Sequence, residues 1–481
     1  MKRIWLILLA VCVMLTLNAC RDYTEDVLEI AMIAENGDLS ALDMYPNLQY
    51  VDLRGSTCYD EIIRYAQSHP EVKVRYHVDL GNEQFDHDAT EISLTPSDFQ
   101  YDVLLQNLKY LPELKELTLI HTELTLEQIQ ALSAAFPDIT IHYDVLFHRE
   151  PLSDSVTEAD FSFLAPEEVS EAVNVISMLP HLTDVQLMRE SGNTNLSIAD
   201  VKMLTEAYPN VNFHYDFKLF GQSVSTMDGE LIFDEVNIGN EGVAQIRDAL
   251  DIMPHCNFVK LDTCKIDDEV MAQLRDDYPD KEIVWRVFIN RYSLLTNEEM
   301  VRMYSKVTNK NAEPLKYCTK VKYLDLYYNS LSDFSFIANM PDLECAILTL
   351  TNISDLTPFT NCQNLIWLEL SNCGKIRDIS CLSQLPNLKY LNISQTKISD
   401  ISALENLPLE RFVCSKSKVS ADDVEAFIAK HPACLTVSKG STLGYGWRYD
   451  DDKQTPFSYY SKIAEIFRYD EKGYYGNRKE K

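Results

Sequence analysis

The chain has 481 residues, of which 46% are hydrophobic, and a formal net charge of -31 at neutral pH. Such a chain can bury a large core, either as two or three ordinary domains or as one elongated array of repeats. A strongly acidic surface repels phosphate backbones, which argues against a nucleic-acid-binding function. The acidity itself fits either a cationic partner or a plain gain in solubility.

Residues 1–19 have the features of an export signal. Lys2 and Arg3 precede an apolar run over residues 4–17 that is too short to span a membrane. The run ends in Leu-Asn-Ala-Cys, which resembles the lipobox of bacterial lipoproteins, whose cysteine carries fatty acids such as palmitate. The resemblance implies lipidation at Cys20 and an extracytoplasmic chain anchored to a bacterial membrane by that lipid alone. An ordinary signal peptide is the alternative.

Residues 20–44 are expected to hold the lipidated N-terminus and a cap, and residues 45–288 contain four blocks that repeat about every 70 residues. Each block has a strand-like segment, a helix-like segment, a proline and a second strand-like segment. The prolines are Pro70, Pro137, Pro209 and Pro279. Further strand-like pieces, TEISL from residue 90 and ADFSFL from residue 159, indicate three strands per block. Residues 289–317 break this rhythm and are predicted to form an irregular, helix-bearing junction.

Residues 318–440 contain shorter repeats of about 22 residues. Five nine-residue segments begin at Val321, Leu343, Leu365, Leu388 and Leu409, and they end at Asn329, Thr351, Cys373, Thr396 and Ser417. The apolar residues at positions 4 and 6 face one side of a short strand. The ninth residue is polar or a thiol because it must bond backbone groups where the chain bends.

These short segments follow the pattern L-x-x-L-x-L-x-x-N/C-x-L and resemble leucine-rich repeats of the internalin-like class. The longer blocks resemble a divergent form of the same repeat. The resemblance implies an α/β solenoid, with parallel strands on the concave face and helices or turns on the convex face. Neighbouring units complete one another's core, because a single unit cannot bury its own apolar face.

The cysteines and the regular aspartates are predicted to be structural. Cys373 and Cys264 stand at the ninth position, and no C-x-x-C pair or zinc-like spacing occurs in the sequence. Disulfides remain an alternative in an exported protein. Four aspartates follow the strands at regular intervals and are expected to cap the next turn. They are Asp333, Asp355, Asp378 and Asp400.

The sequence contains no familiar catalytic motif, so we predict a protein without catalytic activity, cofactor or metal. Two His-Tyr-Asp segments, residues 142–144 and 214–216, point their tyrosine inward and their histidine and aspartate outward. They are interpreted as a solvated surface ladder, with metal binding as the alternative.

The predicted partner-binding surface is a column of side chains at positions 3 and 5 of the short repeats. It consists of Tyr323, Asp325, Trp367, Glu369 and Tyr390. Aromatic anchors on a rigid sheet are typical of interfaces. The alternative is that these rings only cover the core. The aromatic-rich residues 441–481 are predicted to cap the last open edge, or else to form a tail that recognises a partner.

The predicted function is therefore a monomeric cell-surface lipoprotein whose repeats bind a protein or another macromolecule, in adhesion, recognition or sensing. Two alternatives belong to other classes. One is an envelope enzyme with a site in the junction or the C-terminal residues, and the other is a structural surface spacer. Such repeats serve many functions, so the fold does not name the partner.

Overall fold

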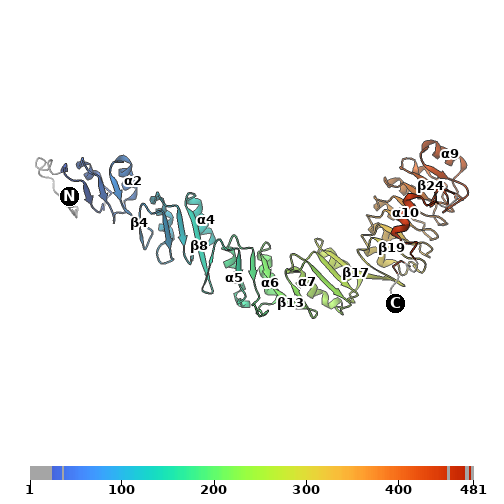
Figure 1. Ribbon diagram of the computed structural model, residues 1–481, viewed down its shortest axis with the longest axis horizontal. Coiled ribbons are helices and arrows are strands. Elements are labelled where there is room, and N and C mark those ends of the chain that lie inside the picture. The colour runs from blue at the N-terminus through green and yellow to red at the C-terminus, as the bar shows by residue number, and fades with distance from the viewer. Residues whose placement is uncertain (1–23, 35–36, 452–454, 472–475, 478–481) are drawn as a thin grey trace. The chain divides into compact units, whose positions relative to one another are not determined.

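A computed structural model describes residues 24–34, 37–451, 455–471 and 476–477. The chain divides into two compact units, Met1–Asp216 and Phe217–Lys481. The predicted Cys20 lipidation site lies outside the described residues. Both units are built from short parallel strands joined by helices or tight turns (Figure 1).

The first unit contains three of the long blocks, each with a sheet of three parallel strands as predicted. The parallel strands are β1 (Glu29–Ala31), β2 (Tyr50–Asp52), β3 (Lys73–Arg75), β6 (Glu91–Leu94), β7 (Glu116–Leu119), β8 (Thr140–Phe147), β10 (Glu158–Asp160), β11 (Asp184–Gln186) and β12 (Asn212–His214). The helices are α2 (Tyr59–Ser68), α3 (Tyr101–Asn107), α4 (Leu126–Ala135), α5 (Val169–Ser177) and α6 (Ile198–Ala207).

The second unit begins with the fourth long block. Its strands are β15 (Glu230–Asp234), β16 (Phe258–Asp262) and β17 (Glu282–Ile289), and its helices are α7 (Val243–Asp251) and α8 (Asp268–Asp277). Alternate residues of β15, such as Leu231 and Phe233, are buried, while the residues between them face outward.

Helices α4 and α6 begin and end where the sequence chemistry dictates. Thr125 and Ser197 form capping boxes with Gln128 and Asp200, so the first free backbone N–H groups of each helix are bonded. Helices α2, α4, α6 and α8 all end two residues before the repeated proline. The residue before a proline is pushed out of the helical conformation, so the proline fixes the helix end and returns the chain to the next strand.

An antiparallel hairpin follows the third strand of every long block, and the sequence did not predict these hairpins. The first halves of β8 and β17 belong to the parallel sheets. Their second halves pair in antiparallel fashion with β9 (Glu150–Ser153) and β18 (Tyr292–Leu295). The other hairpins pair β4 (His77–Asp79) with β5 (Gln84–Asp86) and β13 (Asp216–Leu219) with β14 (Gln222–Ser225). Each hairpin ends a parallel ladder, so the sheets of successive blocks are separate.

The short repeats form one seven-stranded parallel sheet. Its strands are β19 (Met300–Arg302), β20 (Tyr323–Asp325), β21 (Cys345–Ile347), β22 (Trp367–Glu369), β23 (Tyr390–Asn392), β24 (Arg411–Val413) and β25 (Leu435–Val437). Mostly 3-10 turns connect the strands, and α9 (Ala421–Lys430) lies between β24 and β25. Residues 289–317, predicted to be an irregular junction, contain β18 and β19 and are more regular than expected.

The ninth residue of each short repeat bonds the backbone, as predicted. The Asn329 amide donates to the carbonyl oxygens of Met303 (2.7 Å) and Leu326 (2.9 Å). The buried Cys373 thiol lies 3.1 Å from the Leu348 carbonyl oxygen. Burial raises the pKa of this thiol, which makes it a poor nucleophile. Cys373 therefore holds a turn, and the ten cysteines of the described chain are all free thiols.

Candidate functional site

The outward face of the seven-stranded sheet is covered by the C-terminal segment, defined as the described residues between 441 and 477, which are 441–451, 455–471 and 476–477. This segment includes α10 (Ser458–Ile466), which lies against the sheet (Figure 1). Its Trp447, Ile463 and Phe467 are fully buried and share one apolar cluster with side chains of the sheet. The sheet contributes Cys345, Ile347, Trp367, Tyr390, Val413 and Val437 to that cluster. The segment thus runs across the strands instead of covering only the last edge.

The centre of this contact is aromatic. The rings of Trp367 and Trp447 have centroids 4.0 Å apart, and those of Tyr390 and Tyr459 are 4.8 Å apart. Phe457 meets Tyr390 edge-on at 5.3 Å. Such pairs stabilise a contact by about 0.5–1.5 kcal/mol each beyond the burial of their area.

A buried ion pair lies beside these rings. Glu369 has no exposed surface and receives hydrogen bonds from Arg448 (2.7 and 3.0 Å), from the Trp447 indole N–H (2.5 Å) and from the Thr349 hydroxyl (2.7 Å). Burial alone would lower the pKa of Arg448, but the adjacent Glu369 carboxylate raises it, so the guanidinium keeps its charge.

A second carboxylate under the segment is Asp325. It accepts hydrogen bonds from the Tyr469 hydroxyl (2.8 Å) and the Tyr327 backbone N–H (3.0 Å), and Arg302 is 4.0 Å away. Burial is the largest influence and raises the pKa of Asp325, and the Glu369 charge adds to this rise. The hydrogen bonds and Arg302 oppose it only in part.

Hydrogen bonds also attach the segment to the sheet near both of its ends. Asn392 donates a hydrogen bond to the Thr442 carbonyl oxygen (2.7 Å). At the other end, the Asn477 side chain accepts from the Arg302 backbone N–H (2.7 Å) and donates to Glu298 (2.8 Å). These contacts reach from β23 back to β19, so they hold the segment across most of the sheet.

The five residues predicted to bind a partner are brought together by the sheet, but the expectation that they are exposed is wrong. Trp367 and Glu369 have no exposed surface, Asp325 and Tyr390 are 6% exposed, and Tyr323 is half-buried. Their predicted role in binding a partner stays a prediction, and it requires the C-terminal segment to leave the sheet. Trp447 and Arg448, which complete this site, were not predicted from the sequence.

The other residues weighed from the sequence are structural in the described chain. The aspartates accept backbone N–H bonds as expected, for example Asp378 from Ser380 (2.7 Å) and Asp400 from Ser402 (2.8 Å). His142 approaches Asp154, whereas His214 pairs with Asp184 on a different sheet. No group of three or more His, Cys, Asp or Glu side chains among the described residues could hold a metal ion.

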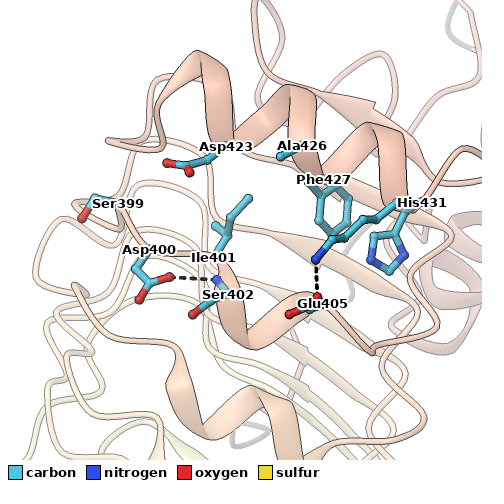
Figure 2. A pocket seen from close by; sticks show the side chains of 10 residues that line it. Ser399, Asp400, Ile401, Ser402, Glu405, Asp423, Ala426, Phe427 and His431 are labelled. Atoms are coloured by element: carbon cyan, nitrogen blue, oxygen red, sulfur yellow. Dashed lines mark hydrogen bonds and ion pairs between the residues drawn. The ribbon is translucent and has the colours of Figure 1, made fainter.

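A surface pocket of about 440 Å³ lies between α9 and the turn around Ser402 (Figure 2). Its charged side chains are already engaged. Lys430 pairs with Glu405, Asp400 accepts the Ser402 backbone N–H, and His431 stacks on Phe427 with centroids 4.4 Å apart. The pocket is thus lined by residues that connect the last turns of the array.

The parallel ladder, the repeating turn and its backbone-bonding ninth residue define a leucine-rich repeat fold. Residues 363–406 match the family of Leucine Rich repeats (2 copies). The chain therefore has a leucine-rich repeat fold, and leucine-rich repeats present extended surfaces suited to protein interaction. No curated protein matches the chain significantly. Within the described residues, no helix is both long and apolar enough to cross a membrane.

Solved structures similar to the chain include two internalins of Listeria monocytogenes. One, inlF, is 18% identical with a TM-score of 0.27, over 74% of this chain and 84% of the internalin. The other, internalin C2, is 24% identical with a TM-score of 0.24, over 30% and 75%. A leucine-rich repeat protein of Leptospira interrogans is 14% identical with a TM-score of 0.29, over 88% and 98%.

Proposed function

We propose that the chain is a monomeric, extracytoplasmic recognition protein that is anchored to a membrane by lipid at Cys20 and binds a protein partner through its long leucine-rich repeats. The anchor is supported by the lipobox-like residues Leu17–Cys20. The observation that carries the binding function is a contrast between the sheets. The C-terminal sheet is covered by its own chain, whereas the outward faces of the β6–β8 and β10–β12 sheets consist of polar side chains that are exposed or half-buried.

The sheet of β6, β7 and β8 shows this open face most clearly. Glu91, Glu116 and Thr140 are side-by-side partners on adjacent strands, and all three are exposed. The first strand of every long block begins its outward face with an exposed glutamate. These residues are Glu29, Glu91, Glu158 and Glu230. Acidic side chains repeated in this way, on a chain with net charge -31, fit a partner with a basic surface.

The anchor is tested by metabolic labelling with a fatty acid. Wild-type cells should incorporate the label and release the protein only with detergent, because the several fatty acids carried by a lipobox cysteine together hold the chain on the membrane. The Cys20→Ala variant should carry no label. Equal labelling of that variant would contradict the anchor.

The binding surface is tested by capture of surface-extract proteins on immobilised residues 21–481. A double charge reversal, Glu91→Lys with Glu116→Lys, should weaken capture of a basic partner at least tenfold, most strongly at low salt. The matched control makes the same change of charge on α9, with Asp422→Lys and Glu425→Lys, where both residues are exposed. Equal capture by all three proteins would exclude the β6–β8 face as the binding surface.

A further inference from the structure

Three tyrosines near the start of the C-terminal sheet form a cluster. Tyr327 packs against the apolar cluster under the C-terminal segment, whereas Tyr304 and Tyr328 lie outside that packing. Tyr304 and Tyr328 are 49% and 53% exposed, and Tyr327 between them is half-buried. The ring centroid of Tyr304 lies 5.6 Å from that of Tyr327 and 5.6 Å from that of Tyr328. The centroids of Tyr327 and Tyr328 are 6.0 Å apart. Together they are called the tyrosine platform.

The repeat itself does not call for tyrosine at these places. Tyr304 and Tyr327 stand two residues after the ends of β19 and β20. The equivalent residues of the next four turns are small and buried: Thr349, Ser371, Ser394 and Ser415. Tyr328 occupies a left-handed position (φ 58°), where the following turns carry Leu350, Asn372, Gln395 and Lys416. Tyr304 and Tyr328 therefore add exposed aromatic surface that the other turns lack.

The backbone beneath the platform is held firmly. The Tyr304 carbonyl oxygen accepts hydrogen bonds from Arg291 (2.7 Å) and from the hydroxyl of the fully buried Tyr292. The buried Asn329 amide donates to the carbonyl oxygens of Met303 and Leu326, which directly follow β19 and β20. A ligand that stacks on these rings would meet a preorganised surface and would lose little additional conformational entropy of the protein.

We propose that the tyrosine platform is a carbohydrate-binding site that takes one or two sugar rings of a glycan. The interplanar angles are 18°, 16° and 34°, so the rings face nearly the same way and do not box in a cation. A sugar ring offers a face of C–H bonds, which the negative face of an aromatic ring attracts, and a rim of hydroxyl groups. The tyrosine hydroxyls can bond that rim.

The size and surroundings of the platform favour a glycan over a protein. A stable protein interface covers about 800 Å² on each partner, with an apolar centre. Three side chains supply only part of that area, and their chain neighbours Lys306 and Ser330 are exposed and polar. Other strongly exposed large apolar side chains of the described chain belong to other elements, such as Phe288 in β17 and Ile428 in α9. The net charge of -31 disfavours stacking by nucleic-acid bases.

The test uses the full chain, purified in a detergent that contains no sugar. Binding is read by saturation-transfer NMR with five disaccharides: cellobiose, maltose, mannobiose, diacetylchitobiose and digalacturonate. The first four are neutral and the last is anionic, so the panel distinguishes the two kinds of glycan. At least one disaccharide should give a signal that is competed by the corresponding polysaccharide.

The variant Tyr304→Ser with Tyr328→Asn gives the two positions residues that later turns already carry, so the fold should be kept. It should weaken binding at least tenfold, whereas Tyr304→Phe with Tyr328→Phe should retain most of it. Gln395→Ala, at the equivalent left-handed position of a later turn, should bind as the wild type does. A panel without any signal, or equal binding by the Ser/Asn variant, would overturn the proposal. Loss of protein capture by that variant with a blank panel would also overturn it, in favour of a protein interface.

Discussion

The ion pair Glu369–Arg448 shows that single residues can determine whether a sheet face is exposed or covered. From the strand pattern, Glu369 is an outward-facing acid on an exposed sheet, and nothing near it in the sequence indicates a partner. In the structure its charge is fully buried, and the residue that compensates it lies 79 positions away. A pattern of period two predicts the face of a strand on which a side chain lies, but it does not predict what covers that face.

Removal of Arg448 should be costly. Arg448→Ala leaves Glu369 buried without its counter-charge, and breaking a buried ion pair in this way costs about 3–5 kcal/mol. The double variant Arg448→Met with Glu369→Met removes both charges and should recover most of that loss. Guanidinium unfolding of residues 21–481 measures the free energy of unfolding of the single and the double variant. A loss below about 1 kcal/mol in the single variant would show that the pair is not buried.

Asp325 gives the contact a pH dependence of defined sign. Its pKa is raised in the folded chain, so its contribution to stability is fully present below the unfolded pKa and is lost as pH rises through the folded pKa. Asp325→Asn removes the ionisation. The free energy of unfolding of the wild type, measured relative to this variant, should therefore fall as the pH is raised from acid to neutral. If the free energies of unfolding of the wild type and of Asp325→Asn change in parallel with pH across that range, the pKa of Asp325 is not raised.

At the scale of elements, much of the fold could be predicted because it rests on local chemistry. The spacing of Leu, Pro and the ninth residue locates the strands, the helix ends at Pro137 and Pro209, and the turns. The hairpins were not predicted. Two of them turn on pairs of residues with positive φ, and His148–Arg149 (51° and 71°) lacks the glycine that usually marks such a turn. The C-terminal residues were predicted to cap the array, but the position of α10 across the face of the sheet was not predicted, because contacts between distant residues leave no periodic signal.

The ninth position of the short repeat provides a paired prediction. Asn329→Ala removes two donors and one acceptor from a buried turn, and each unsatisfied backbone group costs about 1–3 kcal/mol. Cys373→Ser keeps a small donor, as the Thr396 hydroxyl is in the next turn, so it should change stability by less than about 1 kcal/mol. Thermal unfolding of the two variants distinguishes these cases. Equal losses of stability in the two variants would mean that packing, and not hydrogen bonding, determines which residue stands at the ninth position.

At the scale of the whole molecule, the chain combines two kinds of sheet. The second and third long blocks have polar outward faces, and the short repeats carry an apolar face that the C-terminal segment of the same chain covers. This difference places the proposed protein-binding surface on the long repeats and leaves the tyrosine platform as an exposed aromatic area at the start of the covered sheet.

The central claim is that residues 441–477 cover the C-terminal sheet in solution. Residues 21–481 contain three tryptophans, Trp285, Trp367 and Trp447, which are at most 2% exposed, and the last two are buried only where segment and sheet meet. Acrylamide quenching of their fluorescence tests this directly. We expect weak quenching of the native chain and a rise of several-fold on unfolding in guanidinium. If a large part of the native fluorescence is quenched as readily as in the unfolded chain, the segment does not cover the sheet.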